Sequence, residues 1–166
     1  MTTGSTDERA ATVSLPNEQQ ILITREFDAP KHLVYRAWTT PELVKQWWAG
    51  RRGTVNSVEI DPRVGGRWRY VMTATGGFEV AFHGEFREIV PNERIVNTEV
   101  YEMPGADDAN APINTVTFTE AGGRTVLTML LDAGSREVRD LILQSGMEAG
   151  MQESLSALED VAARLA

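Results

Sequence analysis

The sequence predicts an α+β fold in which a curved, antiparallel sheet of seven strands wraps around a long C-terminal helix. Apolar and polar residues alternate in period two along most of residues 54–131, and short turn signals separate the runs. After Ser135 the hydrophobic period changes to 3.6 and continues to the end of the chain. The sheet then has one apolar face to cover and the helix has one apolar stripe, so packing them together buries both.

The elements follow one another without a second domain boundary. Residues 1–19 are polar and are expected to form a flexible leader, whereas residues 20–166 are expected to form one domain. Prolines at positions 30 and 41 mark the first turns of two short helices. The predicted elements are a strand within 20–30, helices at 31–38 and 42–48, strands at 54–61, 67–73, 78–90, 94–103, 113–120 and 124–132, and a helix from residue 135 onward.

The last helix carries two further signals. Ser135 is the predicted N-cap, because its hydroxyl can accept a hydrogen bond from the first turn. Gly146 and Gly150 lie within the helical pattern, and glycine costs a helix about 1 kcal/mol relative to alanine. They therefore predict either a bend or the close approach of another backbone.

Composition and charge argue against several classes of function. The formal net charge is −8, which disfavours a binder of nucleic acids or anionic membranes because those proteins need a basic surface. There is no cysteine, so thiolate catalysis and cysteine zinc sites are excluded. The N-terminus lacks the basic and apolar regions of a signal peptide, and no run approaches about 18 apolar residues. We therefore expect a cytoplasmic protein.

The best candidates for acid–base chemistry are His83 and Glu85. They lie two residues apart on the long predicted strand and so share one face of the sheet. That pair fits a general base if the face is turned inward. The other face carries Phe78, Phe82 and Phe86, which are the more obvious core residues, so the pattern favours His83 and Glu85 on the solvent side.

No metal or cofactor site is predicted. Two separated histidines without cysteine do not form a zinc site, and Asp107 and Asp108 lack the spacing of a calcium loop. The glycine pairs in VGGRW and TGGFE lie between predicted strands, whereas a phosphate-binding loop needs a helix directly after it.

Three segments carry a resemblance to a known family. They are REFDAPKHLVYRAWTTPELVKQWWAG, DPRVGGRWRYVM and HGEFREIVPNERIVNTE. In this order they resemble the activator-of-heat-shock-protein-90-ATPase-like branch of the START-like, or SRPBCC, superfamily, and the resemblance extends from Ile21 to the C-terminus. It implies a START-like domain with a helix-grip fold, in which the sheet grips the C-terminal helix around a hydrophobic cavity. Members of the superfamily use that cavity for lipids, sterols, polyketides or hormones, with or without catalysis.

Within such a fold, an aromatic and methionine stripe fits a cavity wall as well as a packed core. We favour the wall, and we expect a binding module for a small hydrophobic, aromatic or lipid-like molecule. Tyr70, Asn97 or an arginine would anchor its polar end. The candidate wall residues are Trp47, Trp48, Trp68, Tyr70, Met72, Phe82, Asn97, Met129, Met147, Met151 and Leu155.

Two other functions stay open. The first is an enzyme of the cyclase, hydratase or hydrolase type, which requires His83 and Glu85 to face the cavity. The second is a stress- or chaperone-linked dimerising interaction module, with a homodimer as its possible form, which predicts an exposed apolar patch near Trp47 and Trp48. The co-chaperone role of the family's eukaryotic namesake is not carried over, because that role depends on an additional domain. The arginines at 51, 52, 67 and 69 fit either a solvated outer face or a cavity mouth that pairs with an acidic or phenolate ligand.

Overall fold

The computed structural model describes residues 10–166, and all statements on the fold refer to these residues. The strands are β1 (Thr12–Ser14), β2 (Gln20–Phe27), β3 (Gly53–Ile60), β4 (Arg67–Ala74), β5 (Glu79–Val90), β6 (Arg94–Thr98), β7 (Val100–Tyr101), β8 (Ile113–Ala121) and β9 (Arg124–Asp132). The helices are α2 (Lys31–Thr39), α3 (Pro41–Trp47), α4 (Arg136–Gln144) and α5 (Met147–Arg164), with a short 3₁₀ turn at Asp108–Asn110.

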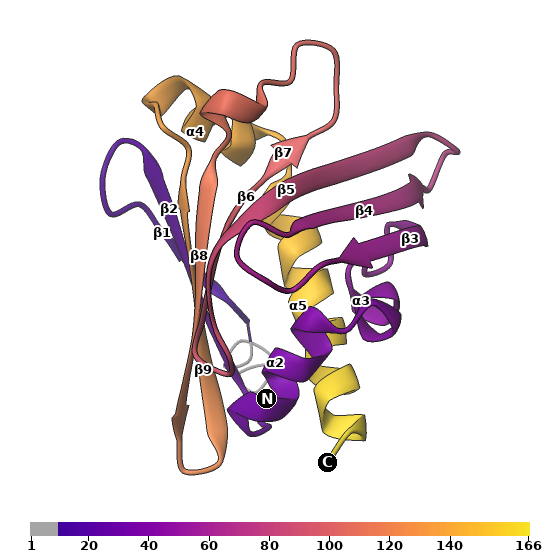
Figure 1. The fold of residues 1–166 in the computed structure, drawn as a ribbon, viewed down its shortest axis with the longest axis vertical. Coiled ribbons are helices and arrows are strands. Elements are labelled where there is room, and N and C mark those ends of the chain that lie inside the picture. Colours follow the sequence, from indigo (N-terminus) through magenta and orange to yellow (C-terminus); the bar gives the residue numbers. More distant parts are fainter. Residues whose placement is uncertain (1–9) are drawn as a thin grey trace, which may run out of the picture.

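The strands form one antiparallel sheet in the order β1-β2-β9-β8-β6-β5-β4-β3, and β7 pairs with β5 outside this path. Figure 1 shows the sheet bent around α5, with α2 and α3 beside that helix and α4 leading into it. The predicted α+β class and its helix-grip arrangement are confirmed.

Part of the predicted leader is a strand. Residues 12–14 pair with β2 as β1, and the side chain of Gln152 on α5 holds this strand by bonds to both the amide and the carbonyl of Ala11 (2.9 and 2.8 Å). Residues 1–9 of the predicted leader lie outside the described residues.

The predicted strand at 94–103 is divided at Glu99 into β6 and β7. The amide of Glu99 donates to the carbonyl of Pro112 (2.9 Å), but proline has no N–H with which to return the bond. The ladder is therefore interrupted at this pair. Together with β1, this division raises the number of strands from the predicted seven to nine in the described residues.

The predicted C-terminal helix is two helices. The hydroxyl of Ser135 accepts from the amide of Val138 (3.1 Å), which confirms the predicted N-cap of α4. Gly146 has a φ of 82°, a left-handed conformation that favours glycine, and it separates α4 from α5. A Cβ on Gly150 would meet only the side chain of Arg52, at 3.6 Å, so no backbone approaches closely there.

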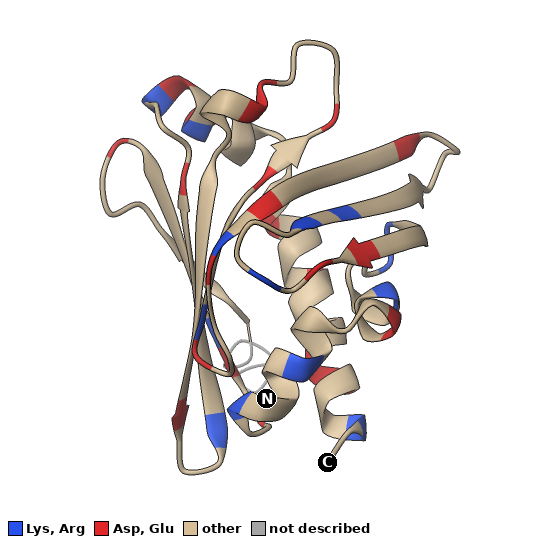
Figure 2. Ribbon diagram, viewed as in Figure 1, with Lys and Arg blue, Asp and Glu red and all other residues tan. Residues whose placement is uncertain are grey.

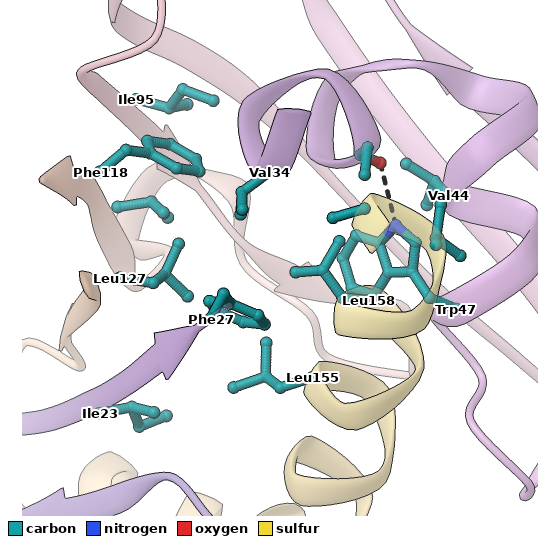
Figure 3. Close-up of a cluster of buried hydrophobic side chains, with 14 of the residues drawn as sticks. Ile23, Phe27, Val34, Val44, Trp47, Ile95, Phe118, Leu127, Leu155 and Leu158 are labelled. Atoms are coloured by element: carbon teal, nitrogen blue, oxygen red, sulfur yellow. Dashed lines mark hydrogen bonds between the residues drawn. The ribbon is translucent and has the colours of Figure 1, made fainter. Parts of the chain in front are cut away.

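The main hydrophobic core lies between β2, β8, β9, α2 and the C-terminal half of α5 (Figure 3). Phe27 and Leu127 on the sheet meet Leu155 and Leu158 on α5, and all four are essentially inaccessible to solvent. Full burial of such a side chain contributes about 1.5–3 kcal/mol. This contact fixes the position of α5 across the concave face of the sheet.

One buried ion pair joins the sheet to α5. Arg25 on β2 has a side chain only 2% exposed, and its Nη2 lies 3.3 Å from Oε1 of Glu159. The other carboxylate oxygen of Glu159 accepts from the amide of Asp28 (3.0 Å). The guanidinium also lies 4.7 Å from the centre of the Phe27 ring. Glu159 therefore ties α5 to the end of β2.

Candidate functional site

An aromatic group lies between the sheet and the N-terminal half of α5. The ring of Trp48, directly after α3, meets Tyr70 on β4 and Phe82 on β5 at centroid distances of 5.2 and 5.8 Å, both edge to face. Trp68 lies 4.9 Å from Tyr70, and Tyr101 stacks on Phe82 at 5.0 Å. These five residues, which we call the aromatic group, come from four segments that the fold brings together.

The chain positions Trp48 by its backbone as well as its ring. The hydroxyl of Ser154 on α5 donates to the carbonyl of Trp48 (2.5 Å). The amide of Arg51 donates to the carboxylate of Glu153, one residue earlier on the same helix (3.2 Å). The end of α3 is thus fixed to α5, and the Trp48 ring is held over the sheet.

The register of β3, β4 and β5 determines which side chains join the aromatic group. Tyr70 lies opposite Val58 and Phe82. Since successive side chains alternate between the faces of a strand, Trp68, Tyr70 and Met72 share the inner face of β4. The arginines of β4 lie on the outer face, and His83 opposite Arg69 lies there too.

Glu99 and Tyr70 are polar groups on the inner side. Burial raises the pKa of Tyr70, and the negative charge of Glu99 raises it further. Burial alone raises the pKa of Glu99. Both side chains nevertheless retain some accessible surface. In the described residues, neither side chain makes a hydrogen bond or an ion pair, so their polar ends are not satisfied by the protein.

Two asparagines lie beside Glu99 on the same inner face. Asn97 on β6 is opposite Asn114 on β8, and both are more than 90% buried. The amide of Asn97 donates to the carbonyl of Thr98 (3.0 Å), which also accepts from the indole of Trp68 (3.1 Å). The side-chain oxygen of Asn114 is buried and has no hydrogen-bond partner. Such a group costs about 1–3 kcal/mol unless something satisfies it.

The other predicted wall residues fall into two sets. Trp47 and Leu155 belong to the packed core, and the indole of Trp47 donates to the carbonyl of Ala37 (2.9 Å). The methyl group of Met72 lies against the backbone of Gly53. By contrast, three methionines are only partly buried against the core and lie on the side of α5 and β9 that faces the interior: Met129, Met147 and Met151.

His83 and Glu85 lie on the outer face, away from α5. Nδ1 of His83 lies 2.7 Å from Glu102 and its Nε2 lies 2.9 Å from Asp108. Glu85 instead accepts from Arg87 (3.1 Å). The structure therefore does not bring His83 and Glu85 together, and neither presents an acid–base group to the interior as the enzyme alternative requires.

The arginines complete this outer network. Arg69 makes two bonds of 2.9 Å to the carboxylate of Glu102, and Arg67 lies 3.7 Å from Asp108. Figure 2 shows the basic positions of β4 running between acidic positions on β3 and β5. The network borders a shallow hollow of about 480 Å³ on the outside of the sheet. These arginines thus balance carboxylates on the outer face rather than reaching the interior.

The outer network makes a testable prediction for pH dependence. Burial of the ring opposes protonation of His83, but its bonds to Asp108 and Glu102 outweigh this, so the pKa of His83 is raised above 6.5. The hydrogen bonds from Arg69 lower the pKa of Glu102 from 4.5 to about 2. Burial acts in the opposite direction, and the bond from His83 adds to the lowering. His83 therefore stabilises the fold fully below its ordinary pKa and loses this effect as pH rises through the raised one. Glu102 stabilises it above its ordinary pKa and loses this effect as pH falls toward the lowered one.

We expect His83→Gln to lower the free energy of unfolding by about 0.5–1 kcal/mol at pH 5.5 and by much less at pH 9. Urea unfolding of both proteins at the two pH values measures this. A loss that is equal at both would contradict a role for the charged imidazole.

Sequence reasoning missed Glu99 and Asn114. Glu99 has the same strand parity as Ile95 and Asn97, so the alternation already indicated a carboxylate on an inner face. Asn114 has the strand parity of Val116 and Phe118, so alternation indicated its inner face, but its pairing with Asn97 depends on the register of the sheet. The predicted apolar patch of an interaction module is not formed near Trp47 and Trp48, since Trp47 is buried and Trp48 packs against the sheet.

The family model that describes Activator of Hsp90 ATPase homolog 1-like protein matches residues 28–163. The chain belongs to this family. The resemblance stated from the three sequence segments is thereby confirmed. No curated protein matches the chain significantly.

Solved structures of several bacterial proteins share the fold. A Rhodobacter sphaeroides protein superposes with a TM-score of 0.83 at 24% identity, covering 93% of this chain and 99% of its own. A Mycobacterium smegmatis protein gives 0.83 at 22% identity, covering 94% and 99%. A Chromobacterium violaceum protein gives 0.73 at 28% identity, covering 88% and 97%. These likenesses support the fold, and function has to be argued from the site.

Two further observations concern the described part of the chain. Among residues 10–166, no three histidine, aspartate or glutamate side chains are arranged to hold a metal ion. No helix in the same range is long and apolar enough to span a membrane.

Proposed function

We propose that this protein binds a small, mainly apolar molecule between the inner face of the sheet and the N-terminal half of α5. The observation that carries the proposal is the combination of the aromatic group with unsatisfied polar atoms beside it. Ligand sites are mostly apolar with a few convergent polar groups, and this arrangement has both. The fold of the family is also one that is commonly used for ligand binding.

The methionines support the same location. Met129, Met147 and Met151 are only partly buried, although they lie on elements whose other ends form the packed core. Methionine is flexible and polarizable, so a wall made of it can adapt to the shape of a ligand. The end of the interior near the start of α5 is therefore less rigidly packed than the end near Leu158.

Entry of a ligand requires these side chains to move. Two hollows among the described residues lie outside, one beside His83 and one beside the turn before β2. The aromatic and methionine side chains occupy the interior instead. We propose that these side chains change rotamer and that α4 shifts slightly, so that the ligand takes their place. No residue of α4 is fully buried, so this helix is free to move.

Binding of the uncharged fluorescent probe N-phenyl-1-naphthylamine tests the proposal. We expect its fluorescence to rise on binding to the wild-type protein. Met151→Trp fills the interior with a bulky ring and is expected to weaken binding by about tenfold or more, which corresponds to about 1.4 kcal/mol. Met103→Trp is the matched control, because Met103 is 55% exposed on the loop after β7.

Circular dichroism confirms that both variants are folded. Equal binding by Met151→Trp and Met103→Trp, or no binding by the wild type, would rule out the interior site.

A further inference from the structure

Glu99 has no positive partner in the part of the chain that the structure describes. Its amide is bonded to the carbonyl of Pro112, and its side chain has the same parity as Asn97, so it is turned inward. The interior arginine Arg25 is engaged with Glu159 on the C-terminal half of α5. A carboxylate that is partly buried without a cation loses part of its hydration, so it is a candidate for pairing with a ligand.

The side chains beside Glu99 offer a hydrogen-bond acceptor and carry no positive charge. Asn97 on β6 and Asn114 on β8 form the pair of residues two positions before Glu99 and after Pro112, at a spacing of roughly 7 Å along the chain. The buried oxygen of Asn114 accepts no hydrogen bond from the protein. A group that fits between Glu99 and Asn114 must therefore donate hydrogen bonds.

The aromatic group favours a cation at the same place. Tyr70 is close enough to Glu99 for that charge to raise its pKa, and Trp48, Trp68 and Phe82 surround Tyr70. Ring faces attract ammonium groups, the more so where water is excluded. Arg67 and Arg69 lie on the outer face and are paired with carboxylates, and Arg52 is paired with Glu153 on α5 (3.5 Å).

We propose that the interior site selects an apolar amine, with its ammonium group between Glu99 and Asn114 and its hydrocarbon or aromatic body against the aromatic group and the methionines. This inference rests on the proposed function, because it assigns the ligand of the same site. Carboxylates and phosphates are disfavoured there, since they would place a second negative charge beside Glu99. Neutral alcohols bind through the apolar wall alone and lack the ion pair.

Three probes of equal length test this choice: n-octylamine, 1-octanol and octanoate, measured by calorimetry at pH 7. We expect the amine to bind about tenfold more tightly than the alcohol, as for a hydrogen bond to a charged group, and octanoate to bind most weakly. Glu99→Gln keeps the side-chain volume and removes the charge, so the preference for the amine should disappear. Glu93→Gln is the matched control, because it removes the same charge at an exposed position.

A second measurement does not depend on a variant. In the wild-type protein the preference for octylamine over octanol should shrink as pH falls and Glu99 becomes protonated, because the ion pair is then lost. A preference that persists to pH 4 would contradict the assignment of Glu99.

The outcomes separate this inference from the proposed function. If octanol and octylamine bind equally well, or if Glu93→Gln reduces the preference as much as Glu99→Gln, the amine assignment is overturned and the apolar site stands. If neither probe binds, the interior site itself is overturned together with its ligand.

Discussion

Replacing Glu159 with alanine should reduce the free energy of unfolding by about 3–5 kcal/mol. The carboxylate accepts from Arg25 and from the amide of Asp28, and the Arg25 side chain is only 2% exposed. Removing it leaves a guanidinium in the interior without the carboxylate that it faces. Small domains are stable by about 5–15 kcal/mol, so this single change removes a large part of the total.

The matched control is Asp160→Ala, one residue further along the same helix. Asp160 is exposed, so its loss should change stability by less than about 0.5 kcal/mol. The double variant Arg25→Met with Glu159→Leu should be less destabilised than Glu159→Ala, because the charge and its partner leave together. Denaturant unfolding of the four proteins measures these differences. Equal losses for Glu159→Ala and Asp160→Ala would show that the ion pair contributes nothing.

The second large effect is expected at Gly84 on β5. A Cβ at this position would overlap the carbonyl of Thr98 and lie 2.5 Å from the indole nitrogen of Trp68. Those two groups are themselves joined by a hydrogen bond of 3.1 Å. Gly84→Ala must therefore push β5 away from the Thr98 backbone and disturb Trp68 in the aromatic group. We expect a loss of about 2–4 kcal/mol, from overpacking and from the weakened bond.

Gly150→Ala is expected to raise the free energy of unfolding, in contrast to Gly84→Ala. Gly150 lies in the interior of α5, and its added Cβ would have no neighbour closer than 3.6 Å. Alanine there should raise stability by about 0.5–1 kcal/mol through helix propensity. Thermal unfolding of both variants measures the two shifts. A change of the same sign in both would contradict the assignment of Gly84 as a position of close backbone approach.

The sequence predicted the faces of the central strands because their alternation is uninterrupted. Trp68, Tyr70 and Met72 are separated from Arg67 and Arg69 by strand parity alone, and the structure shows these two sets on opposite faces. The same reasoning favoured the outer face for His83, where it contacts Glu102 and Asp108. Local pattern is sufficient wherever neighbouring residues decide the direction of a side chain.

Features that depend on pairing between distant segments could not be predicted. The strand at Thr12–Ser14 is three residues long with a single apolar residue, and it exists because β2 and Gln152 hold it. The division of β6 from β7 depends on Pro112 lying opposite Glu99. Neither partner is identifiable until the register of the sheet is known.

In the candidate site, too, some residues could be placed from the local pattern and others could not. Alternation placed Tyr70 and Phe82 on one face, but it could not distinguish Trp47, which packs in the core, from Trp48, which lies over the sheet. Helix α3 ends at Trp47, and Trp48 is its C-cap. Because consecutive helical residues are rotated by about 100°, the side chains of Trp47 and Trp48 point in different directions. Asn114 became a candidate only through its missing hydrogen bond.

The central claim is that an apolar ligand lies between the sheet and the start of α5. The most direct test follows the methionine methyl groups by NMR while N-phenyl-1-naphthylamine is added to the wild-type protein. We predict saturable shifts at Met129, Met147 and Met151, which face the interior, and none at Met103, which is exposed on the loop after β7. Shifts at Met103 with unchanged interior methionines would contradict the claim.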